Sequence, residues 1–385
     1  MIGRIAIENY KSIENLTLDL GRVTVLIGAN GSGKSNILEA IALCSAAAAN
    51  KLDNEFLFAR GIRVPDDPRH MRSAFSRDAK DIIELLVDDD SAENIYTASL
   101  SYDSPLDFWS VTNYEWYDYI DKVKNDYIRD RYESDEEKKS HRQQFRTVTL
   151  DFSKLLYEKY SKSGLIDYLP FAPENTSLRR FEEEGQIQPL GIRGEGLFKL
   201  LTVLARDENR DRLAELQERL QLLDWFGEFQ IGGNVALGER TLRIRDQYLD
   251  GDLAYFTQRS ANEGFLFLLF YFALFVAKET PRFFAVDNID ASLNPKLCAE
   301  LLRQLTELAA KYDKQVILTT HNPAVLDGLN LQDDNQRLYV VERDLDGRTQ
   351  ARRVPAPRPP EKHEEPVPLS EAFLRGYIGG LPKNF

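Results

Sequence analysis

The chain has few residues of the kind that build covalent or metal-centred frameworks. Only two of its 385 residues are cysteine, Cys44 and Cys298, which excludes a disulfide framework and a structural zinc site made of CxxC pairs. The four histidines do not cluster along the sequence, so no histidine-based metal site is expected. This cysteine usage favours a reducing compartment, and we expect a cytoplasmic protein.

Long hydrophobic runs and an excess of positive charge are also absent. The most apolar run, residues 265–277, is shorter than the roughly 20 residues that span a bilayer, and it predicts a buried helix. The first residues lack a basic region followed by an apolar core, so we expect neither a secretory signal nor a membrane partner. The formal net charge is -13, so any contact with nucleic acid requires a local basic patch.

What the chain does have is enough apolar residues for a core and a regular pattern at its start. Apolar side chains make up 43% of the residues, which predicts at least one substantial core. Alternating apolar residues over positions 5–20 predict two antiparallel strands, and VTVLI at positions 23–27 predicts a short buried strand. A glycine-rich stretch and an apolar helix follow, in the order strand, loop, helix.

The glycine-rich stretch GANGSGKS, residues 28–35, matches the pattern G-x-x-x-x-G-K-[ST] of phosphate-binding loops. Small residues let several backbone N–H groups close around a phosphate, and the following helix adds the positive end of its dipole. We expect Lys34 to reach the β- and γ-phosphates of a nucleotide and Ser35 to bind Mg²⁺. A chance Gly/Ser turn before a helix is the alternative. The predicted nucleotide-binding residues are Gly28, Asn30, Gly31, Ser32, Gly33, Lys34, Ser35 and Asn36.

Two later strands end in residues suited to the same chemistry. FFAVD, residues 283–287, is an apolar strand that delivers Asp287, which we predict as a magnesium ligand opposite the loop. VILTTHNP places His321 after the next predicted strand, where an imidazole is able to sense a γ-phosphate or to position water. A helix-capping role for Asp287 and a structural role for His321 are the alternatives.

Together these segments resemble the ATP-binding-cassette (ABC) type ATPase heads of the SMC, RecF and OLD-like group. IENYKSIENLTLDLGRVTVLIGANGSGKSNILEAI is similar to their opening, VDNIDASLNP to their Walker B and D-loop, and ILTTHNPAVLDGL to their switch-histidine segment. The resemblance implies an α/β fold, a P-loop NTPase of the ABC-ATPase type with a mixed central sheet, N-terminal antiparallel strands and an inserted, mainly helical subdomain. It also implies ATP and Mg²⁺ as cofactors.

A signature segment before Walker B is a further implication of this resemblance. SANEGFLFLL is the candidate, with Asn262 where these ATPases usually have Ser or Gly, and Gly264 at the glycine position. In the family, this surface closes on the γ-phosphate of ATP held by a second subunit. As a polar loop that opens an apolar helix, the segment also fits an anion-binding helix N-terminus, and a simple helix start is the alternative.

The sequence departs from the family pattern at two points. The family usually follows the Walker B Asp with a Glu that polarises the attacking water, but this chain has Asn288, whose amide cannot take a proton. We therefore expect slow ATP hydrolysis, with Asp290 or His321 as partial substitutes for the missing base. No Q-loop glutamine is assigned, and the candidates are Gln143, Gln144, Gln186 and Gln188.

Composition and resemblance divide the chain into five parts. Residues 1–101 and 229–354 form the ATPase head, the first with the phosphate-binding loop and the second with the signature, Walker B and switch histidine. Residues 102–228 form the mainly helical insertion. Residues 355–368 contain six prolines among charged residues and predict an extended linker, and residues 369–385 form a short amphipathic helix and tail.

The resemblance implies a nucleotide-gated module in which two copies enclose two ATP molecules, as a homodimer or a higher homo-oligomer. The opening and the C-terminal LRGYIGGLPKNF are similar to ATPases that accompany TOPRIM-like or other nuclease subunits in bacterial anti-phage operons. A separate nuclease effector and a defence role are therefore the leading interpretation, by analogy.

Two other functions are weighed against this one. A RecF-like repair or replication ATPase would bind DNA directly and needs a basic face, although solvated charge is the alternative for each arginine. The arginines that would form it are Arg60, Arg63, Arg69, Arg72 and Arg77, or Arg179, Arg180 and Arg193. A transporter motor is disfavoured, because such subunits carry a full LSGGQ-like signature and a Walker B Glu, and this chain has neither.

Overall fold

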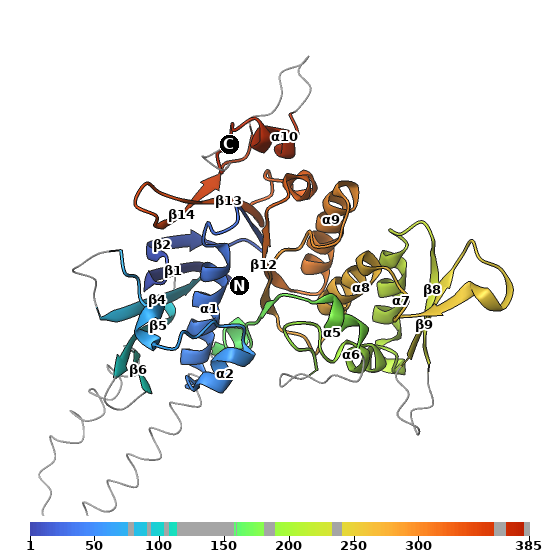
Figure 1. Ribbon diagram of the computed structural model, residues 1–385, viewed down its shortest axis with the longest axis horizontal. Helices are drawn as coiled ribbons and strands as arrows, with labels where there is room; N and C mark the ends of the chain where they lie inside the picture. The colour runs from blue at the N-terminus through green and yellow to red at the C-terminus, as the bar shows by residue number, and fades with distance from the viewer. Residues whose placement is uncertain are drawn as a thin grey trace, which may run out of the picture.

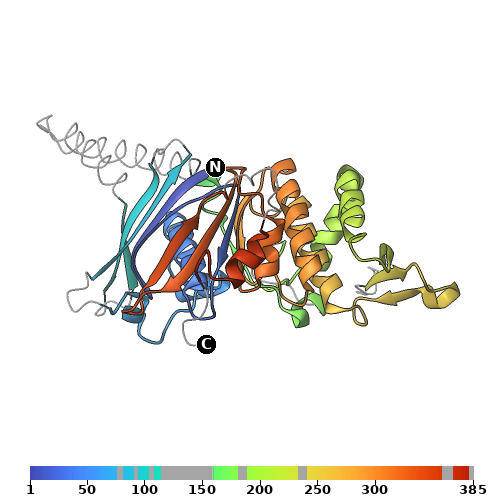
Figure 2. The same cartoon turned by 90° about the horizontal axis from the view of Figure 1, so that it is seen from above.

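The computed structural model describes residues 1–75, 81–90, 94–103, 108–113, 158, 160–180, 189–232, 241–357 and 367–380. Three β-sheets and the helices that cover them make up this part of the chain (Figure 1). A five-stranded antiparallel sheet lies at one end of the molecule and a three-stranded sheet at the other (Figure 2).

The helices and strands have the following bounds. The strands are β1 (Ile2–Tyr10), β2 (Ile13–Asp19), β3 (Val23–Ile27), β4 (Ile82–Asp89), β5 (Asn94–Asp103), β6 (Phe108–Asn113), β7 (Pro170–Phe171), β8 (Phe226–Gly232), β9 (Thr241–Asp246), β10 (Tyr255–Thr257), β11 (Phe283–Val286), β12 (Gln315–Thr320), β13 (Gln336–Arg343) and β14 (Thr349–Val354). The α-helices are α1 (Lys34–Ala48), α2 (Asn54–Ala59), α5 (Asn175–Arg179), α6 (Leu197–Leu204), α7 (Arg210–Leu220), α8 (Glu263–Val276), α9 (Pro295–Lys311) and α10 (Leu369–Leu374). Short 3-10 helices are η1 (Pro68–Met71), η2 (Asp207–Asn209), η4 (Gly251–Ala254) and η5 (Pro323–Gly328).

A six-stranded sheet in the order β14-β13-β3-β12-β11-β7 forms the centre of the fold. Its neighbouring strands are parallel except for the antiparallel hairpin of β13 and β14, whose turn contains Asp346 and Gly347. Because the parallel strands start at one edge, the residues that follow β3, β11 and β12 meet at the opposite edge. This topology brings the phosphate-binding loop, Asp287 and His321 to the same edge of the sheet.

Both faces of the central sheet are covered, which explains why its strands are almost wholly apolar. Val25 and Leu318 join a core on one face that includes α8 and α9. Leu26 and Ile317 alternate with them and join a second core, which includes α1, on the other face. The apolar run that predicted a buried helix is α8, and the prediction is confirmed because all of its residues from Phe265 onward are buried.

The five-stranded sheet has the order β2-β1-β4-β5-β6, and its antiparallel first pair confirms the strands predicted at the N-terminus. Helix α1 shares one core with this sheet and with the central sheet. We expected the insertion to begin at residue 102, but β5 runs to Asp103 and β6 pairs with it in register. Strand pairing therefore carries the head sheet to residue 113, and the aromatic residues Phe108 and Trp109 lie in β6.

The segment expected as a mainly helical insertion contains more than helices. Its helices include α6 and α7, which lie with α5 and α8 in a lobe beside the central sheet (Figure 1). The same lobe holds a three-stranded antiparallel sheet, β10-β9-β8. In addition, β7 lies within the expected insertion yet pairs with β11 of the central sheet. A two-residue strand is too short to give a periodic pattern, so the sequence did not reveal it.

The C-terminal helix α10 docks on its own head, against η5 (Figure 1). Phe373 is 5% exposed and belongs to the core under α8 and α9. The Ser370 hydroxyl and backbone N–H donate to the Asp327 carboxylate at 2.6 and 2.9 Å. The helix ends at Leu374, and the chain turns at Gly376, which has a positive φ of 75°. Most of the predicted linker lies outside the described residues. Within the described part of the chain, no helix has the length and apolarity needed to span a membrane.

Candidate nucleotide-binding site

The glycine-rich loop joins β3 to α1 and has a backbone that only glycine permits at its key positions. Gly31 and Gly33 have positive φ angles of 77° and 108°. A Cβ atom on Gly28 would lie 2.0 Å from the Val341 carbonyl oxygen, and one on Gly33 would lie 2.0 Å from Thr349 Oγ1. The loop is thus held closely against β13 and β14, which turns it into a concave surface at the start of α1.

Lys34, the first residue of α1, folds back over this loop. Its Nζ donates to the Gly28 and Ala29 carbonyl oxygens at 2.7 and 3.1 Å. Burial lowers the pKa of the ammonium, while the negative charges of Asp287 and Asp290 act in the opposite direction. A buried ammonium that contacts only neutral acceptors favours a nearby anion, and a nucleotide phosphate supplies one.

Ser35 and Asp287, the predicted magnesium ligands, are in direct contact. The Ser35 hydroxyl donates to Asp287 Oδ2 at 2.9 Å, and the Thr319 hydroxyl donates to Asp287 Oδ1. Hydroxyl and carboxylate oxygens are the ligands that Mg²⁺ prefers, so these residues fit the ion that the fold implies. When bound, Mg²⁺ would neutralise charge on the phosphates.

A pocket of about 260 Å³ surrounds these groups. Its lining includes the predicted residues from Asn30 to Asn36, together with Asp287 and Asn288. The Ser32 hydroxyl is buried and has no hydrogen-bond partner among the described residues. An unpaired buried hydroxyl in a ring of backbone N–H groups is a second feature that fits a phosphate ligand.

Asn288 occupies the position where the resemblance implies a catalytic glutamate. Its backbone is left-handed, with a φ of 55°, and its N–H donates to Thr319 Oγ1 at 3.0 Å. Asparagine tolerates this conformation better than most residues. The side chain lines the pocket, where its amide can hold water but cannot accept a proton from it.

Asp290 and His321, the suggested substitutes for the missing base, pair with each other. Asp290 Oδ1 accepts from the Thr320 hydroxyl at 2.6 Å, and His321 Nε2 lies 3.5 Å from Asp290 Oδ2. The Asp290 side chain is 5% exposed, whereas the His321 side chain is 54% exposed. Asp290 is therefore placed to orient the imidazole rather than to contact phosphate, and neither residue lines the 260 Å³ pocket.

The candidate signature segment lies at a different pocket of the same chain. Asn262 caps α8, since its Oδ1 accepts from the Phe265 N–H at 2.7 Å. A Cβ atom on Gly264 would lie 3.3 Å from the Ser292 carbonyl oxygen, so the start of α8 is packed against the segment after Asp287. Asn262 and Gly264 line a pocket of about 1040 Å³. It shares no lining residue with the pocket of about 260 Å³ at the phosphate-binding loop, here called the phosphate pocket.

Three residues at the phosphate pocket were missed by sequence reasoning. Arg343 Nε donates to the Gly31 carbonyl oxygen at 2.9 Å, and Arg63 donates to Asn36 Oδ1 at 3.0 Å. Thr319 holds both Asp287 and Asn288. Only Thr319 had a usable signal, its place next to last in the strand that ends at Thr320, because the arginines reach the pocket through contacts between distant segments. All four Q-loop candidates lie outside the described residues.

Residues 23–327 match the family described as "AAA domain, putative AbiEii toxin, Type IV TA system". A DNA replication and repair protein RecF from Lachnoclostridium phytofermentans is 32% identical over 84 residues, 21% of this chain and 22% of that protein. An OLD nuclease from Thermus scotoductus is 34% identical over 67 residues, 17% of this chain and 11% of that protein. The chain thus matches only a small part of each relative.

Solved SMC head domains have a similar fold. An SMC head bound to the C-winged helix domain of ScpA is similar with a TM-score of 0.57 and 13% identity, over 92% of this chain and 98% of that chain. An SMC head with an extended coiled coil, bound to the C-terminal domain of ScpA from Pyrococcus furiosus, has a TM-score of 0.50 and 12% identity, over 92% and 96%. At this identity the similarity concerns the fold alone, and it confirms the predicted ABC-type P-loop ATPase fold.

Proposed function

The chain belongs to the AAA-domain family that its residues 23–327 match, and from this premise we propose that it is a slow ATPase that self-associates around ATP. The observation that carries the proposal is the separation of two half-sites. The phosphate-binding loop lines one pocket, and Asn262 and Gly264 line another. A second copy, docked head to tail, would complete each nucleotide site with its own signature segment. The assembly formed in this way is a homodimer, or a larger homo-oligomer built from homodimers.

ATP and Mg²⁺ are the proposed cofactors. Support comes from the buried Lys34 ammonium, the contact between Ser35 and Asp287, and the unpaired Ser32 hydroxyl. Lys34 would bind the β- and γ-phosphates, while Ser35 and Asp287 would hold the metal. Loop residues Gly28–Asn36 provide the backbone surface on which the phosphates lie.

Slow hydrolysis is the proposed consequence of Asn288. General-base catalysis contributes typically 10²–10⁴-fold to a rate, so an amide in this place removes a large part of the acceleration. His321, oriented by Asp290, is a group able to accept a proton near this edge of the sheet. A weak base of this kind favours a long-lived ATP-bound dimer.

We further propose that the dimer regulates a separate effector that acts on nucleic acid, in anti-phage defence. The family description, which names a toxin–antitoxin system, supports this setting, as does the local similarity to an OLD nuclease. The chain purified alone should therefore not cleave DNA, and metal-dependent cleavage by the isolated chain would contradict this part of the proposal.

A RecF-like ATPase that binds DNA directly remains the second candidate, favoured by the local similarity to a RecF protein. Its basic face has less support, because four of its arginines are engaged by carboxylates. These ion pairs are Arg63–Glu39, Arg69–Asp67, Arg72–Asp81 and Arg193–Glu174. Arg77 lies outside the described residues. Nucleotide-dependent DNA binding that weakens with salt, with no partner present, would favour this candidate.

Mixing two inactive variants tests the composite site. Lys34→Ala removes the phosphate-binding ammonium, and Asn262→Asp keeps the helix cap but adds a negative charge that repels a γ-phosphate. In a mixed dimer one site carries both changes and the other carries neither. ATPase activity in an equal mixture should therefore recover to about a quarter of the unmodified level under random pairing. Asn262→Ser, a neutral cap, is the matched control. Folded variants that show no recovery on mixing would contradict the proposal.

A further inference from the structure

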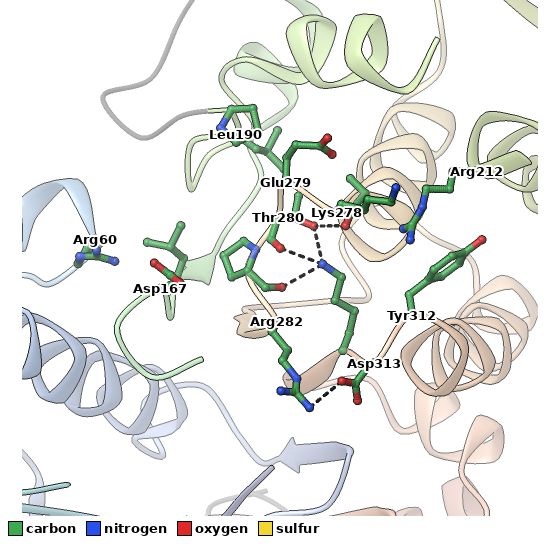
Figure 3. Close-up of a pocket in the computed structure, with 15 residues that line it drawn as sticks. Arg60, Asp167, Leu190, Arg212, Lys278, Glu279, Thr280, Arg282, Tyr312 and Asp313 are labelled. Carbon is green, nitrogen blue, oxygen red and sulfur yellow. Dashed lines mark hydrogen bonds and ion pairs between the residues drawn. The ribbon is translucent and has the colours of Figure 1, made fainter. Parts of the chain in front are cut away.

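A second polar pocket, of about 590 Å³, lies at the edge of the central sheet opposite the phosphate-binding loop (Figure 3). It is lined by the residues that precede β11 and β12, whereas the nucleotide site is built from residues that follow them. Residues of α7 and of the segments next to α2, β7 and α6 complete the wall. A volume of this size lies within the usual range for small-molecule sites.

Positive side chains from separate parts of the chain converge on this pocket, although the chain as a whole has a net charge of -13. The five cations of the lining are Arg60, Arg212, Lys278, Arg282 and Lys314. The three acidic residues are Asp167, Glu279 and Asp313. One of these acids is already neutralised, since Asp313 pairs with Arg282 at 2.6 Å and with Arg22 at 3.1 Å. The charges that remain on the lining side chains therefore sum to a positive net charge.

Lys314 is the most buried of these cations, at 4% exposure. Its Nζ donates to Thr280 O and Thr280 Oγ1, both at 2.9 Å, and to Pro281 O at 3.2 Å, as the dashed lines in Figure 3 indicate. All three acceptors are uncharged, so the ammonium has no counterion in contact. Burying a charge in this way is unfavourable unless an opposite charge compensates it, and an anion in the pocket would add to the negative charge of Glu279 in the lining.

Two arginines and a lysine offer further interactions. Arg60 donates to Tyr168 O at 3.1 Å, while its buried Nε has no partner among the described residues. Arg212 stacks on the Tyr312 ring, with 4.4 Å between Cζ and the ring centroid. Lys278 is exposed at the mouth, so its ammonium is free to move toward a ligand. Planar guanidinium groups with a nearby ammonium are the usual partners of phosphate oxygens.

The pocket also touches the connection between the two halves of the nucleotide site. Residues 277–282, which supply six of its lining residues, link the end of α8 directly to β11. Helix α8 begins at the signature segment, and β11 ends at Val286, directly before Asp287. Lys314 donates to carbonyl groups of this connection at Thr280 and Pro281, and Arg212 donates to the carbonyl group of Val276, the last residue of α8.

We propose that this pocket is a second ligand site, separate from the nucleotide site, that binds a small anion bearing phosphate groups. The bound anion rests against the connection between the signature helix and the Walker B strand. Its binding free energy is therefore coupled to the relative position of these two elements, and by linkage ATP binding alters the affinity for the anion.

Binding of pyrophosphate to the Lys34→Ala protein tests the proposal without interference from the phosphate-binding loop. Isothermal titration calorimetry at low salt should detect one site. Lys278→Glu in the same background should weaken binding by about tenfold, since it reverses a charge at the mouth. Arg206→Glu, an exposed arginine that does not line the pocket, makes the same change in net charge and should leave the affinity unchanged within twofold. Because Lys278 is exposed, its substitution should not alter the melting temperature.

Competition with AMP distinguishes a nucleotide ligand from an inorganic phosphate chain. AMP that competes with pyrophosphate would support the proposal and identify nucleotides as the ligand class, whereas absence of competition together with pyrophosphate binding would support an inorganic phosphate chain. Three results would overturn it: no binding of pyrophosphate to Lys34→Ala, equal weakening by Lys278→Glu and Arg206→Glu, or binding of duplex DNA alone. None of these results tests ATP binding at the phosphate-binding loop. The proposed second ligand site can therefore be wrong while the proposed ATPase function is right, and the reverse also holds.

Discussion

The backbone N–H of Asn288 donates to the Thr319 hydroxyl at 3.0 Å, and the same hydroxyl donates to the carboxylate of Asp287. One side chain on β12 therefore fixes both the proposed magnesium ligand and the residue that stands in place of a catalytic base. The Asn288 side chain is an amide, which cannot accept a proton from water, and this property is the basis of the proposed slow hydrolysis.

Restoring a carboxylate at this position should accelerate the reaction. Asn288→Glu should raise ATP turnover by about 100-fold, the typical contribution of a general base. The left-handed backbone should lower the free energy of unfolding by about 1 kcal/mol in this variant. Phosphate release at saturating ATP measures the first effect, and chemical denaturation measures the second. Asn288→Gln has the same length without a base, so equal turnover in both variants would show that the amide does not limit hydrolysis.

Removing the Thr319 hydroxyl should weaken magnesium binding. Thr319→Val keeps the shape of the side chain but leaves Asp287 Oδ1 without its hydroxyl donor, while the Ser35 hydroxyl still donates to Oδ2. Loss of a residue that orients a metal ligand typically costs about 10–100-fold in metal affinity. The Mg²⁺ concentration for half-maximal ATPase activity should rise by at least about tenfold. Thr306→Val, which removes only a bond to Leu302 O within α9, is the control. An unchanged Mg²⁺ requirement in Thr319→Val would contradict the assignment of this site.

Lys314 should make stability depend on pH. Burial lowers its pKa from 10.5 to about 7, with a further lowering by Arg212 and an opposing effect of Glu279. Between these values the unfolded chain binds more protons than the folded one, so the free energy of unfolding should rise with pH from about 7 to about 10. Below pH 7 both states hold the proton and this contribution is constant. Lys314→Met should reduce the slope, measured by urea denaturation, whereas exposed Lys162→Met should not. Equal slopes in all three proteins would contradict this role of Lys314.

The contact of α10 with its own head should contribute to stability. Phe373→Ala should lower the free energy of unfolding by about 3 kcal/mol, because it removes a 5% exposed ring from the core. Leu374→Ala, at a neighbouring side chain that is 62% exposed, should change it by less than about 0.5 kcal/mol. If Phe373→Ala instead left stability unchanged but abolished self-association, α10 would be a partner-binding element in solution.

The nucleotide half-site was predictable because its determinants are local. The phosphate-binding loop is one continuous motif, and Asp287 and His321 each follow an apolar strand, so parallel strand order was enough to bring them together. The pairing of Asp290 with His321 was not predictable, because the direction of each side chain depends on the turn after β11. The same limit applies to Arg343, which reaches Gly31 only because β13 pairs with β3.

The boundaries of the insertion were harder to predict for a related reason. Aromatic residues such as Phe108 and Trp109 are compatible with a helix, a loop or a strand, and only pairing with β5 decides between them. Strand β7 has two residues and carries no periodicity at all. The second polar pocket, of about 590 Å³, is lined by residues that are far apart in sequence, so no single stretch of the chain indicated it.

The central claim, that ATP joins two copies of this chain through the phosphate-binding loop, is tested most directly by sedimentation velocity with and without Mg-ATP. We predict that Mg-ATP converts a slower species into one with the mass of a dimer or a multiple of it, and that Lys34→Ala prevents this change while Lys162→Ala does not. A sedimentation coefficient that is the same with and without Mg-ATP, or an equal shift in the Lys34→Ala protein, would contradict the account.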